Sequence, residues 1–442
     1  MKFGTDGIRG VANSELTVEL SLALGRAAVR VLGGQDFLIG RDTRVSGPAI
    51  SAALAAGMAS EGANVCDVGV LPTPAVAHLS NLHSRPAAMV SASHNAYADN
   101  GIKFFLPGGK KLTDDIEERL EAELYGSKAS ASRAVSSNVG LVDGSAHGAS
   151  WAAYGAHVRD SMKDADASGL RVVVDCANGA ASEGVEKIFR ELGVDVVVIN
   201  AEPNGMNIND NCGSTHPQGL QSAVVAHGAQ VGLGLDGDAD RVLAVDETGQ
   251  LIDGDQMMCL FASDMKSRGI LASDTLVVTV MSNLGLHRSM QRQGIKVHST
   301  AVGDRYVLEA LDANKWSLGG EQSGHIVFPD IGATGDGIMT GALLLSVVKR
   351  GGGSLHDLAA QAMTRYPQVL TNVVVKDRTR LDSADAVWQE VKAVEQELGD
   401  DGRVLLRPSG TESLIRVMVE AADATTANDT CARLCAVVEK HV

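Results

Sequence analysis

Apolar residues recur along this chain in two alternating patterns, one typical of helices and one typical of short buried strands. The spacing of apolar side chains predicts a helix over residues 18–32, and the unbroken apolar run at 86–90 predicts a buried strand. The succession continues to about residue 365, with further strands expected at 36–39, 64–68, 170–174, 195–199, 231–235, 275–280 and 296–299. Strands that alternate with helices in this way predict an α/β fold with parallel or mixed sheets and helices on their faces.

Changes in composition and pattern divide the chain into four expected domains. Residues 126–150 are rich in Ser, Ala and Gly and lack clear periodicity, which predicts a surface connection. Each of the first three regions repeats strands, a turn motif and helices, so we expect three related α/β domains with mixed sheets. Pro367 opens a region of strands and helices that predicts a smaller C-terminal α+β domain. The expected domain boundaries are 1–150, 151–248, 249–365 and 366–442.

Composition excludes several classes of protein. The 442 residues are 45% hydrophobic, which is ample for packed cores. A net charge of −16 argues against a general nucleic-acid binder, although a small phosphorylated ligand needs only a local basic pocket. No apolar run approaches the roughly 20 residues that span a bilayer, and the N-terminus has no apolar signal segment, so no membrane association is expected. Six cysteines without a CxxC pair are typical of reduced thiols in a cytoplasmic protein.

A hydroxyl-rich turn follows the strand expected at 86–90. Ser93 and His94 belong to the sequence SASHN just past that strand, and Lys103 follows ten residues after Ser93. Open α/β sheets bind their ligands beyond the carboxyl ends of strands. This placement favours Ser93 as a nucleophile or phosphate carrier, but an ordinary serine-rich loop would give the same local pattern.

The strongest local signal is the run DGDADR at residues 236–241. Asp236, Asp238 and Asp240 alternate directly after the strand expected at 231–235. A tight loop can bring three carboxylates onto one hard cation, and oxygen ligands suit Mg²⁺ or Ca²⁺. A helix–loop–helix calcium site is excluded, because Arg241 stands where that loop needs glycine and both flanks are expected strands. A solvated acidic turn is the simpler alternative.

Three further motifs carry groups suited to sugar phosphates. GTDGIRG at 4–10 carries Arg9, which suits a phosphate-facing loop, although a plain N-terminal turn explains it equally well. GEQSGH at 320–325 combines a carboxylate, an amide, a hydroxyl and an imidazole, which can bind sugar hydroxyls, and Glu321 could also face a substrate ammonium. RPSGTE at 407–412 offers an arginine, two hydroxyls and backbone N–H groups, which can clamp a phosphate. The last two motifs are also compatible with ordinary polar turns.

The five motifs occur together and in order along the whole chain, and in this combination the sequence resembles the α-D-phosphohexomutase superfamily. The glutamine of GEQSGH and the CGSTH loop at 212–216 are similar to its glucosamine branch. The resemblance implies four domains around a central cleft, and an isomerase-class intramolecular phosphotransferase that interconverts glucosamine 6-phosphate and glucosamine 1-phosphate for UDP-N-acetylglucosamine synthesis. It also implies one Mg²⁺ per subunit, a glucosamine 1,6-bisphosphate intermediate, a small phosphosugar as partner, and suggests a homodimer.

The resemblance assigns roles to individual residues. Ser93 is similar to the phosphorylated serine, whose phosphate oxygen would complete a metal site formed by Asp236, Asp238 and Asp240. Four residues match positions beside the transferring phosphoryl group, with acid–base work at the place of Lys103 or His94: Arg9, His94, Lys103 and Arg241. The residues that match the sugar-recognition loop are Glu321, Ser323 and His325, and those that match the distal phosphate clamp are Arg407, Ser409, Gly410 and Thr411.

Two residues depart from the family pattern. Ala96 and Ser413 stand where the family usually has proline after SASHN and after SGTE. Proline presets a loop, so we expect softer turns here without the loss of a catalytic group. The alternatives to a glucosamine-phosphate mutase are a phosphomannomutase or phosphoglucomutase of the same superfamily, a hydrolase, and a non-catalytic sugar-phosphate-binding homologue.

Overall fold

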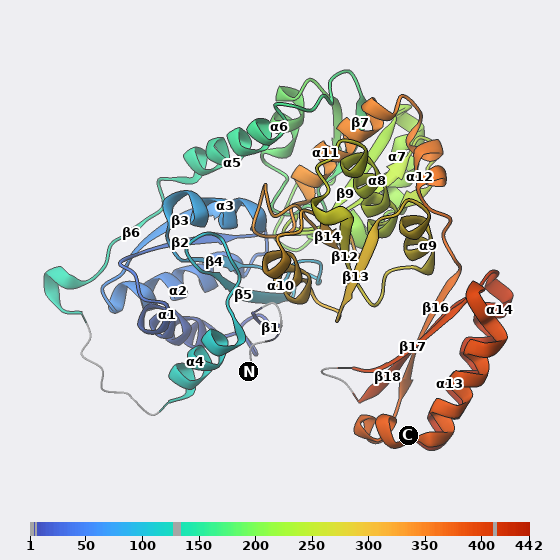
Figure 1. Cartoon of the computed structure of the whole chain (residues 1–442). Coiled ribbons are helices and arrows are strands. Elements are labelled where there is room, and N and C mark those ends of the chain that lie inside the picture. Colours follow the sequence, from blue (N-terminus) through green and yellow to red (C-terminus); the bar gives the residue numbers. More distant parts are fainter. Residues whose placement is uncertain (1–3, 5–6, 127–133, 410–412) are drawn as a thin grey trace. The chain divides into compact units, whose positions relative to one another are not determined.

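A computed structural model of the chain describes residues 4, 7–126, 134–409 and 413–442 (Figure 1). The chain forms two compact units. The larger contains Met1–Val280 and Ile295–Ala360, and the smaller contains Met281–Gly294 and Gln361–Val442. The smaller unit therefore combines a short internal segment with the C-terminal region.

The first sheet of the larger unit is mixed, as the alternation of strands and helices predicts. Its strands are β1 (Ile8–Val11), β2 (Asp36–Arg41), β3 (Asn64–Val70), β4 (Ala87–Val90), β5 (Asp99–Phe105) and β6 (Val142–Asp143). They lie in the order β1-β5-β4-β2-β3-β6. Strands β4, β2, β3 and β6 run parallel, whereas β5 is antiparallel to both β4 and β1.

Helices cover both faces of this sheet. They are α1 (Val18–Leu32), α2 (Gly47–Ser60), α3 (Thr73–His83), α4 (Asp114–Tyr125) and, beyond them, α5 (His147–Ser161). Alternate residues of β2 enter two different cores, because side chains of a strand alternate between its faces. Phe37 and Ile39 join Leu24 of α1 and Leu54 of α2 in one fully buried core. Gly40 faces α3 instead, where a Cβ atom would lie 2.4 Å from Val76 Cγ2.

The second sheet places the acidic motif at a strand end. Its elements are β7 (Arg171–Asp175), α6 (Val185–Glu191), β8 (Asp195–Ile199), α7 (Gln218–His227), β9 (Val231–Leu235), β10 (Val242–Asp246) and β11 (Leu251–Ile252). The order is β11-β10-β9-β7-β8. Strands β9, β7 and β8 are parallel, and β10 is antiparallel to both of its neighbours, β9 and β11. Val173 packs on Leu220 of α7. Because Leu235 pairs with Val242, residues 236–241 form the turn that joins β9 to β10.

The third sheet carries the GEQSGH motif between two very short strands. Its elements are α8 (Gly254–Ser267), β12 (Thr275–Thr279), β13 (Lys296–Thr300), α10 (Asp304–Asn314), β14 (Gly319–Gly320), β15 (Ile326–Val327), α11 (Gly337–Gly351) and α12 (Leu355–Ala362). The strand order is β13-β12-β14-β15. Helix α10 packs on β12 through Val277, Val307 and Leu311. The antiparallel pairing of β14 with β15 makes 321–325 a closed turn.

The smaller unit has one antiparallel sheet covered on one face by two helices. Its elements are α9 (Leu284–Arg292), β16 (Gln368–Val374), α13 (Asp385–Leu398), β17 (Arg403–Pro408), β18 (Leu414–Glu420) and α14 (Ala424–His441), with strand order β16-β18-β17. Val391, Ile415 and Leu434 share its core. Helix α9 is tied to the C-terminal region at its first residues. The Asn283 Oδ1 atom accepts the Tyr366 N–H at 3.0 Å, and Glu420 accepts the Leu284 N–H at 3.0 Å.

Most helices and strands lie where the apolar pattern predicts them, but several places differ. Ile8–Val11 forms a strand, so Arg9 projects from β1 and not from a glycine-rich loop. Strand β5 begins at Asp99, before the apolar run at 102–105, because it pairs with β1. The pattern does not predict α4, and α5 begins at His147 within the expected connection. None of the helices in the described part of the chain is both long and apolar enough to cross a membrane.

Candidate active site

The hydroxyl of Ser93 lies against the acidic turn of the second sheet. Its Oγ atom donates a hydrogen bond to Asp236 Oδ2 at 2.6 Å, and the residue is 1% exposed. Its backbone has φ +52°, a left-handed conformation that is costly for a residue with a side chain. Residues in such conformations are found most often at functional sites. The imidazole of His94 lies next to it, with Nδ1 3.3 Å from Ser93 Oγ.

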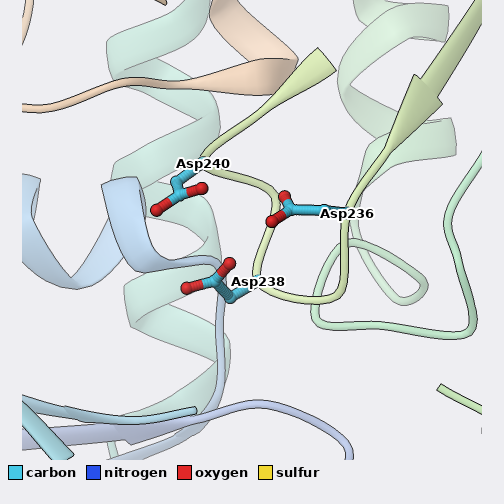
Figure 2. Close-up of side chains that lie close together, drawn as sticks. All are labelled: Asp236, Asp238 and Asp240. Atoms are coloured by element: carbon cyan, nitrogen blue, oxygen red, sulfur yellow. The ribbon is translucent and has the colours of Figure 1, made fainter. Parts of the chain in front are cut away.

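Three carboxylates converge on the turn between β9 and β10 (Figure 2). Asp236, Asp238 and Asp240 each offer an oxygen within 4.8 Å of the others, and all three residues are buried. Ala239 has φ +55°, which bends the turn tightly enough to aim alternate side chains at one point. The predicted convergence of these three residues is confirmed.

The donor set of this turn fits a hard divalent cation. Among the residues that the structure describes, none donates a hydrogen bond to Asp238 Oδ1 or Asp240 Oδ1, although both atoms are buried. A buried carboxylate oxygen without a donor is costly unless a cation or another donor meets it. Carboxylate oxygens are the ligands that Mg²⁺ prefers, so these residues fit that metal.

Charge in the turn is unevenly distributed. Burial, together with repulsion from Asp240 and Asp238, raises the pKa of Asp236 well above its ordinary value. Burial acts in the same direction on Asp240 and is the largest single effect, but Lys103, His325 and Arg241 together outweigh it, so the pKa of Asp240 is lowered. Lys103 Nζ, on β5, lies 2.8 Å from Asp238 Oδ2 and 3.4 Å from Asp240 Oδ2. The lysine therefore offsets part of the repulsion among the carboxylates.

Two arginines border the same site. Arg9 lies on β1 opposite Gly101 of β5. The backbone N–H of Arg241 donates to Asp236 Oδ1 at 3.2 Å, and its Nε atom lies 3.8 Å from Asp240 Oδ1. Burial, followed by the positive charges of Arg241 and Arg9, lowers the pKa of His94 to about 4. The structure thus brings Ser93 and the acidic turn together with four predicted residues: Arg9, His94, Lys103 and Arg241.

The GEQSGH turn contacts the acidic turn from the third sheet. His325 is 2% exposed, its Nδ1 atom lies 3.7 Å from Asp240 Oδ1, and its Nε2 atom accepts the Gly335 N–H at 3.1 Å. Glu321 Oε1 accepts the Gly303 N–H at 3.2 Å. Ser323 is exposed on the same turn. The three residues predicted for sugar recognition share one turn, with His325 on its buried side.

The predicted phosphate clamp lies in the smaller unit. Arg407 lies next to the last residue of β17 and pairs in register with Arg416 of β18. Burial, followed by repulsion from Arg416, lowers the pKa of Arg407. The Ser409 N–H donates to the Leu414 carbonyl at 2.9 Å, and Arg378 donates to the Ser409 carbonyl. Gly410 and Thr411 lie outside the described residues.

Three residues that the motifs do not single out contact the site. Thr73, at the start of α3, donates its hydroxyl hydrogen to Asp238 Oδ2 at 2.5 Å. Arg44 and Asn209 donate to backbone carbonyls of the SASHN loop. The sequence does place Arg44 in a polar run, GRDTRVSG, directly after a predicted strand, which is a weak signal of the kind that identified Ser93. Thr73 and Asn209 act across large sequence separations, so no local pattern marks them.

Comparison with known families defines the class of protein. Four family models of phosphoglucomutase/phosphomannomutase match this chain. The model of alpha/beta/alpha domain I matches residues 1–130, that of domain II residues 152–249, that of domain III residues 253–366 and that of the C-terminal domain residues 370–437. The chain belongs to the phosphoglucomutase/phosphomannomutase family of phosphohexomutases. The predicted fold class and superfamily are confirmed.

Within this family, the chain is similar to curated phosphoglucosamine mutases. Proteins named phosphoglucosamine mutase are 51% identical to this chain in Mycolicibacterium smegmatis, with 98% of this chain and 97% of the relative covered, and 53% identical in Mycobacterium tuberculosis, with 95% of each covered.

Solved structures share the fold over the full chain. A phosphoglucomutase/phosphomannomutase family protein from Burkholderia thailandensis has a TM-score of 0.81 at 25% identity, covering 99% of this chain and 97% of that one. An N-acetylphosphoglucosamine mutase from Aspergillus fumigatus, solved in complex with GlcNAc-6P and magnesium, has a TM-score of 0.72 at 19% identity. The match covers 100% of this chain and 96% of that one.

Proposed function

We propose that this chain is a phosphoglucosamine mutase, which interconverts glucosamine 6-phosphate and glucosamine 1-phosphate through phospho-Ser93. The observation that carries the proposal is the 2.6 Å hydrogen bond between Ser93 Oγ and Asp236, because it places a potential phosphate carrier at a metal-binding turn. Identity of 51–53% to curated phosphoglucosamine mutases over nearly the whole chain supports the choice of sugar.

The first half of the reaction transfers the phosphoryl group from the protein to the sugar. The 1-hydroxyl oxygen of glucosamine 6-phosphate attacks phosphorus, the bond from phosphorus to Ser93 Oγ breaks, and glucosamine 1,6-bisphosphate results. The hydroxyl proton passes to His94, which is neutral at pH 7 because its pKa is about 4. As Ser93 Oγ leaves, it takes up a proton from His94 Nδ1, 3.3 Å away, or from the Lys103 ammonium. Arg9 and Arg241 offset charge on the equatorial phosphoryl oxygens.

The second half restores phospho-Ser93. After the bisphosphate turns over, the Ser93 Oγ atom attacks the 6-phosphate, and the 6-hydroxyl leaves with a proton as glucosamine 1-phosphate is released. Ser93 Oγ already has two acceptors within reach, Asp236 Oδ2 at 2.6 Å and His94 Nδ1 at 3.3 Å, to which its proton can pass. Asp236, Asp238 and Asp240 would hold Mg²⁺, which when bound polarises phosphoryl oxygens.

The other motifs recognise the rest of the substrate in this proposal. Glu321, Ser323 and His325 bind sugar hydroxyls, and Glu321 faces the ammonium group that distinguishes glucosamine from glucose. Arg407, Ser409, Gly410 and Thr411 hold whichever phosphate is not reacting. Support for these roles comes from residue chemistry and from the family motifs.

The test is a coupled assay on purified protein with Mg²⁺ and trace bisphosphate, with glucosamine, mannose and glucose 6-phosphates assayed side by side. Intact mass is recorded on the same samples. We expect glucosamine 1-phosphate as the preferred product, and Ser93→Ala to lose both turnover and one phosphate of mass. Ser222→Ala, on the exposed face of α7, is the matched control and keeps both. Turnover in phosphorylated protein only with mannose or glucose phosphates would overturn the choice of sugar, and turnover in Ser93→Ala would overturn the carrier.

The clamp has its own test. Arg407→Ala removes the guanidinium that would pair with the non-reacting phosphate, so we expect the KM for sugar phosphate to rise about 10- to 100-fold, the range of one or two charge-assisted hydrogen bonds. Steady-state kinetics measures this rise. Arg433→Ala is the control in the same unit, because Arg433 forms exposed ion pairs with Glu390 and Glu397. An unchanged KM in Arg407→Ala would contradict the clamp.

A further inference from the structure

Two side chains from different sheets hold the backbone of the SASHN loop. Arg44 lies between β2 and α2 of the first sheet, and Asn209 lies between β8 and α7 of the second sheet. Both are buried, at 1% and 7% exposure. Neither has a role in the proposed cycle.

Their donors converge on the same two carbonyl oxygens. Ser93 O accepts from Arg44 Nη2 at 2.9 Å and from Asn209 Nδ2 at 2.9 Å. Asn95 O accepts from the same two nitrogen atoms, at 2.9 Å and 3.0 Å. Arg44 Nη1 also donates to the Ala96 carbonyl and, at 3.0 Å, to the Asp99 carbonyl. The guanidinium therefore fixes the turn at Ala96, where the family proline is missing.

Arg44 is itself held in place by the buried carboxylate of Asp42. Its Nε atom donates to Asp42 Oδ2 at 2.8 Å. The same carboxylate oxygen accepts from Ser91 Oγ at 2.6 Å, and Ser91 Oγ accepts the Ser93 N–H at 2.9 Å. The backbone on both sides of Ser93 is thus connected to one buried ion pair. A rigid connection of this kind can maintain the left-handed conformation of Ser93, which is otherwise costly.

Asn209 links the same loop to the acidic turn. Its Nδ2 atom lies 2.9 Å from the position that a Cβ atom would take on Gly237, and Ser93 O lies 2.6 Å from that position. Only a glycine between Asp236 and Asp238 allows this approach. The amide of Asn209 therefore sits where the serine loop of one sheet meets the acidic turn of the other.

We propose that Arg44 and Asn209 are positioning residues that hold the Ser93 hydroxyl at the acidic turn. The proposal rests on the proposed function, because it concerns the atom that would carry phosphate. Phosphoryl transfer depends on alignment of the attacking and leaving oxygens, and a displacement of about 1 Å can cost roughly 100-fold in rate. Since Arg44 and Asn209 contact only the backbone of the loop, they govern where Ser93 lies and not its chemistry.

Asn211 provides a matched control for Asn209 on the same loop. Both residues have a left-handed backbone, at φ +58° and +52°, so replacing either with alanine carries a similar backbone cost. The side chain of Asn211 is exposed and donates to its neighbour Asp210. A difference between the two alanine variants therefore reports on the contacts of the Asn209 amide.

The first measurement is the steady-state kinetics of the full-length Asn209→Ala and Asn211→Ala variants with Mg²⁺ and bisphosphate. We expect kcat to fall about 10- to 100-fold in Asn209→Ala, with the KM for glucosamine 6-phosphate within about threefold of wild type, because the serine and not the sugar site is displaced. Asn211→Ala keeps both constants. Equal kcat in the two variants, or a change in Asn209→Ala that affects only KM, would overturn the positioning role.

The second measurement separates this proposal from the proposed function. Hydrogen–deuterium exchange is followed by mass spectrometry on peptides covering residues 91–100, in wild type, Asn209→Ala, Asn211→Ala and Arg44→Lys. We expect faster exchange in that segment in Asn209→Ala and Arg44→Lys only. If the wild type is inactive but shows this exchange pattern, the mutase is rejected and the positioning of the loop by Arg44 and Asn209 is kept. Unchanged exchange in Asn209→Ala rejects that positioning role whatever the activity.

Discussion

At the scale of single residues, the site combines groups that are individually unfavourable in a folded protein. Ser93 has a left-handed backbone, and three buried carboxylates lie within 4.8 Å of one another. Lys103 compensates only part of this charge. Unfavourable arrangements of this kind persist where a bound group or the surrounding structure stabilises them.

Replacing one carboxylate should therefore have opposite effects with and without metal. In Asp236→Asn we expect the melting temperature of metal-free protein to rise, because repulsion with Asp238 and Asp240 is relieved. The same change should reduce the stabilisation by Mg²⁺, which for wild type is about 2.7 kcal/mol at a hundredfold excess over Kd. Thermal unfolding with EDTA and with Mg²⁺ measures both effects. A variant that is less stable in EDTA and equally responsive to Mg²⁺ would contradict the metal site.

Asp336 predicts a pH dependence of the stability of the fold. Its carboxylate caps α11 and accepts the Tyr154 hydroxyl at 2.8 and 2.9 Å, and burial raises its pKa from 3.8 to about 6. The folded protein thus binds this proton more tightly than the unfolded chain does. Stability is greatest below about pH 4 for this group and falls as pH rises to about 6, by up to roughly 3 kcal/mol.

Asp336→Asn should remove this dependence. The free energy of unfolding of the variant, relative to wild type, should rise by up to roughly 3 kcal/mol between pH 4 and pH 7. Urea unfolding at several pH values measures the difference. A difference that does not vary with pH would show that Asp336 keeps an ordinary affinity for its proton in the folded state.

At the scale of elements, the sequence predicts most of the scaffold and the centre of the site. Apolar runs mark the buried strands, and motifs at their carboxyl ends identify Ser93 and the acidic turn because open sheets bind ligands there. Strand β1 is not predicted, because its four residues lie among glycines and show no alternating pattern. Helix α4 is not predicted, because charged residues dominate its sequence. Asn209 is not predicted, because its contact with Ser93 spans 116 residues.

The packing of α1 against α2 gives a prediction about helix glycines. A Cβ atom on Gly57 of α2 would lie 2.2 Å from the Leu22 carbonyl oxygen of α1, so Gly57→Ala should force the helices apart and cost about 1–3 kcal/mol. Gly219, exposed near the start of α7, has no atom within 4 Å of its Cβ position. Gly219→Ala should stabilise by up to about 1 kcal/mol. Thermal unfolding measures both shifts, and shifts of the same sign would contradict the packing.

At the scale of the whole molecule, the two compact units predict two unfolding events. The acidic turn belongs to the larger unit, so in calorimetry Mg²⁺ should raise only the transition of that unit. Glu420, fully buried in the smaller unit, pairs with Arg403 at 2.9 Å and accepts the Leu284 N–H. Glu420→Gln should lower only the other transition, by roughly 1–3 kcal/mol. A single transition that responds to both changes would show that the units unfold together.

The two-part make-up of the smaller unit also sets an order of events during synthesis. Helix α9 is finished about 70 residues before the segment that begins at Gln361, an interval on the order of 3–14 s at 5–20 residues per second. Its partners in the mature fold, among them Ala362, Tyr366 and Glu420, leave the ribosome only after that interval. A nascent chain that stalls within this interval carries α9 without its partners. Translation speed and chaperone binding during this interval therefore bear on the yield of folded protein.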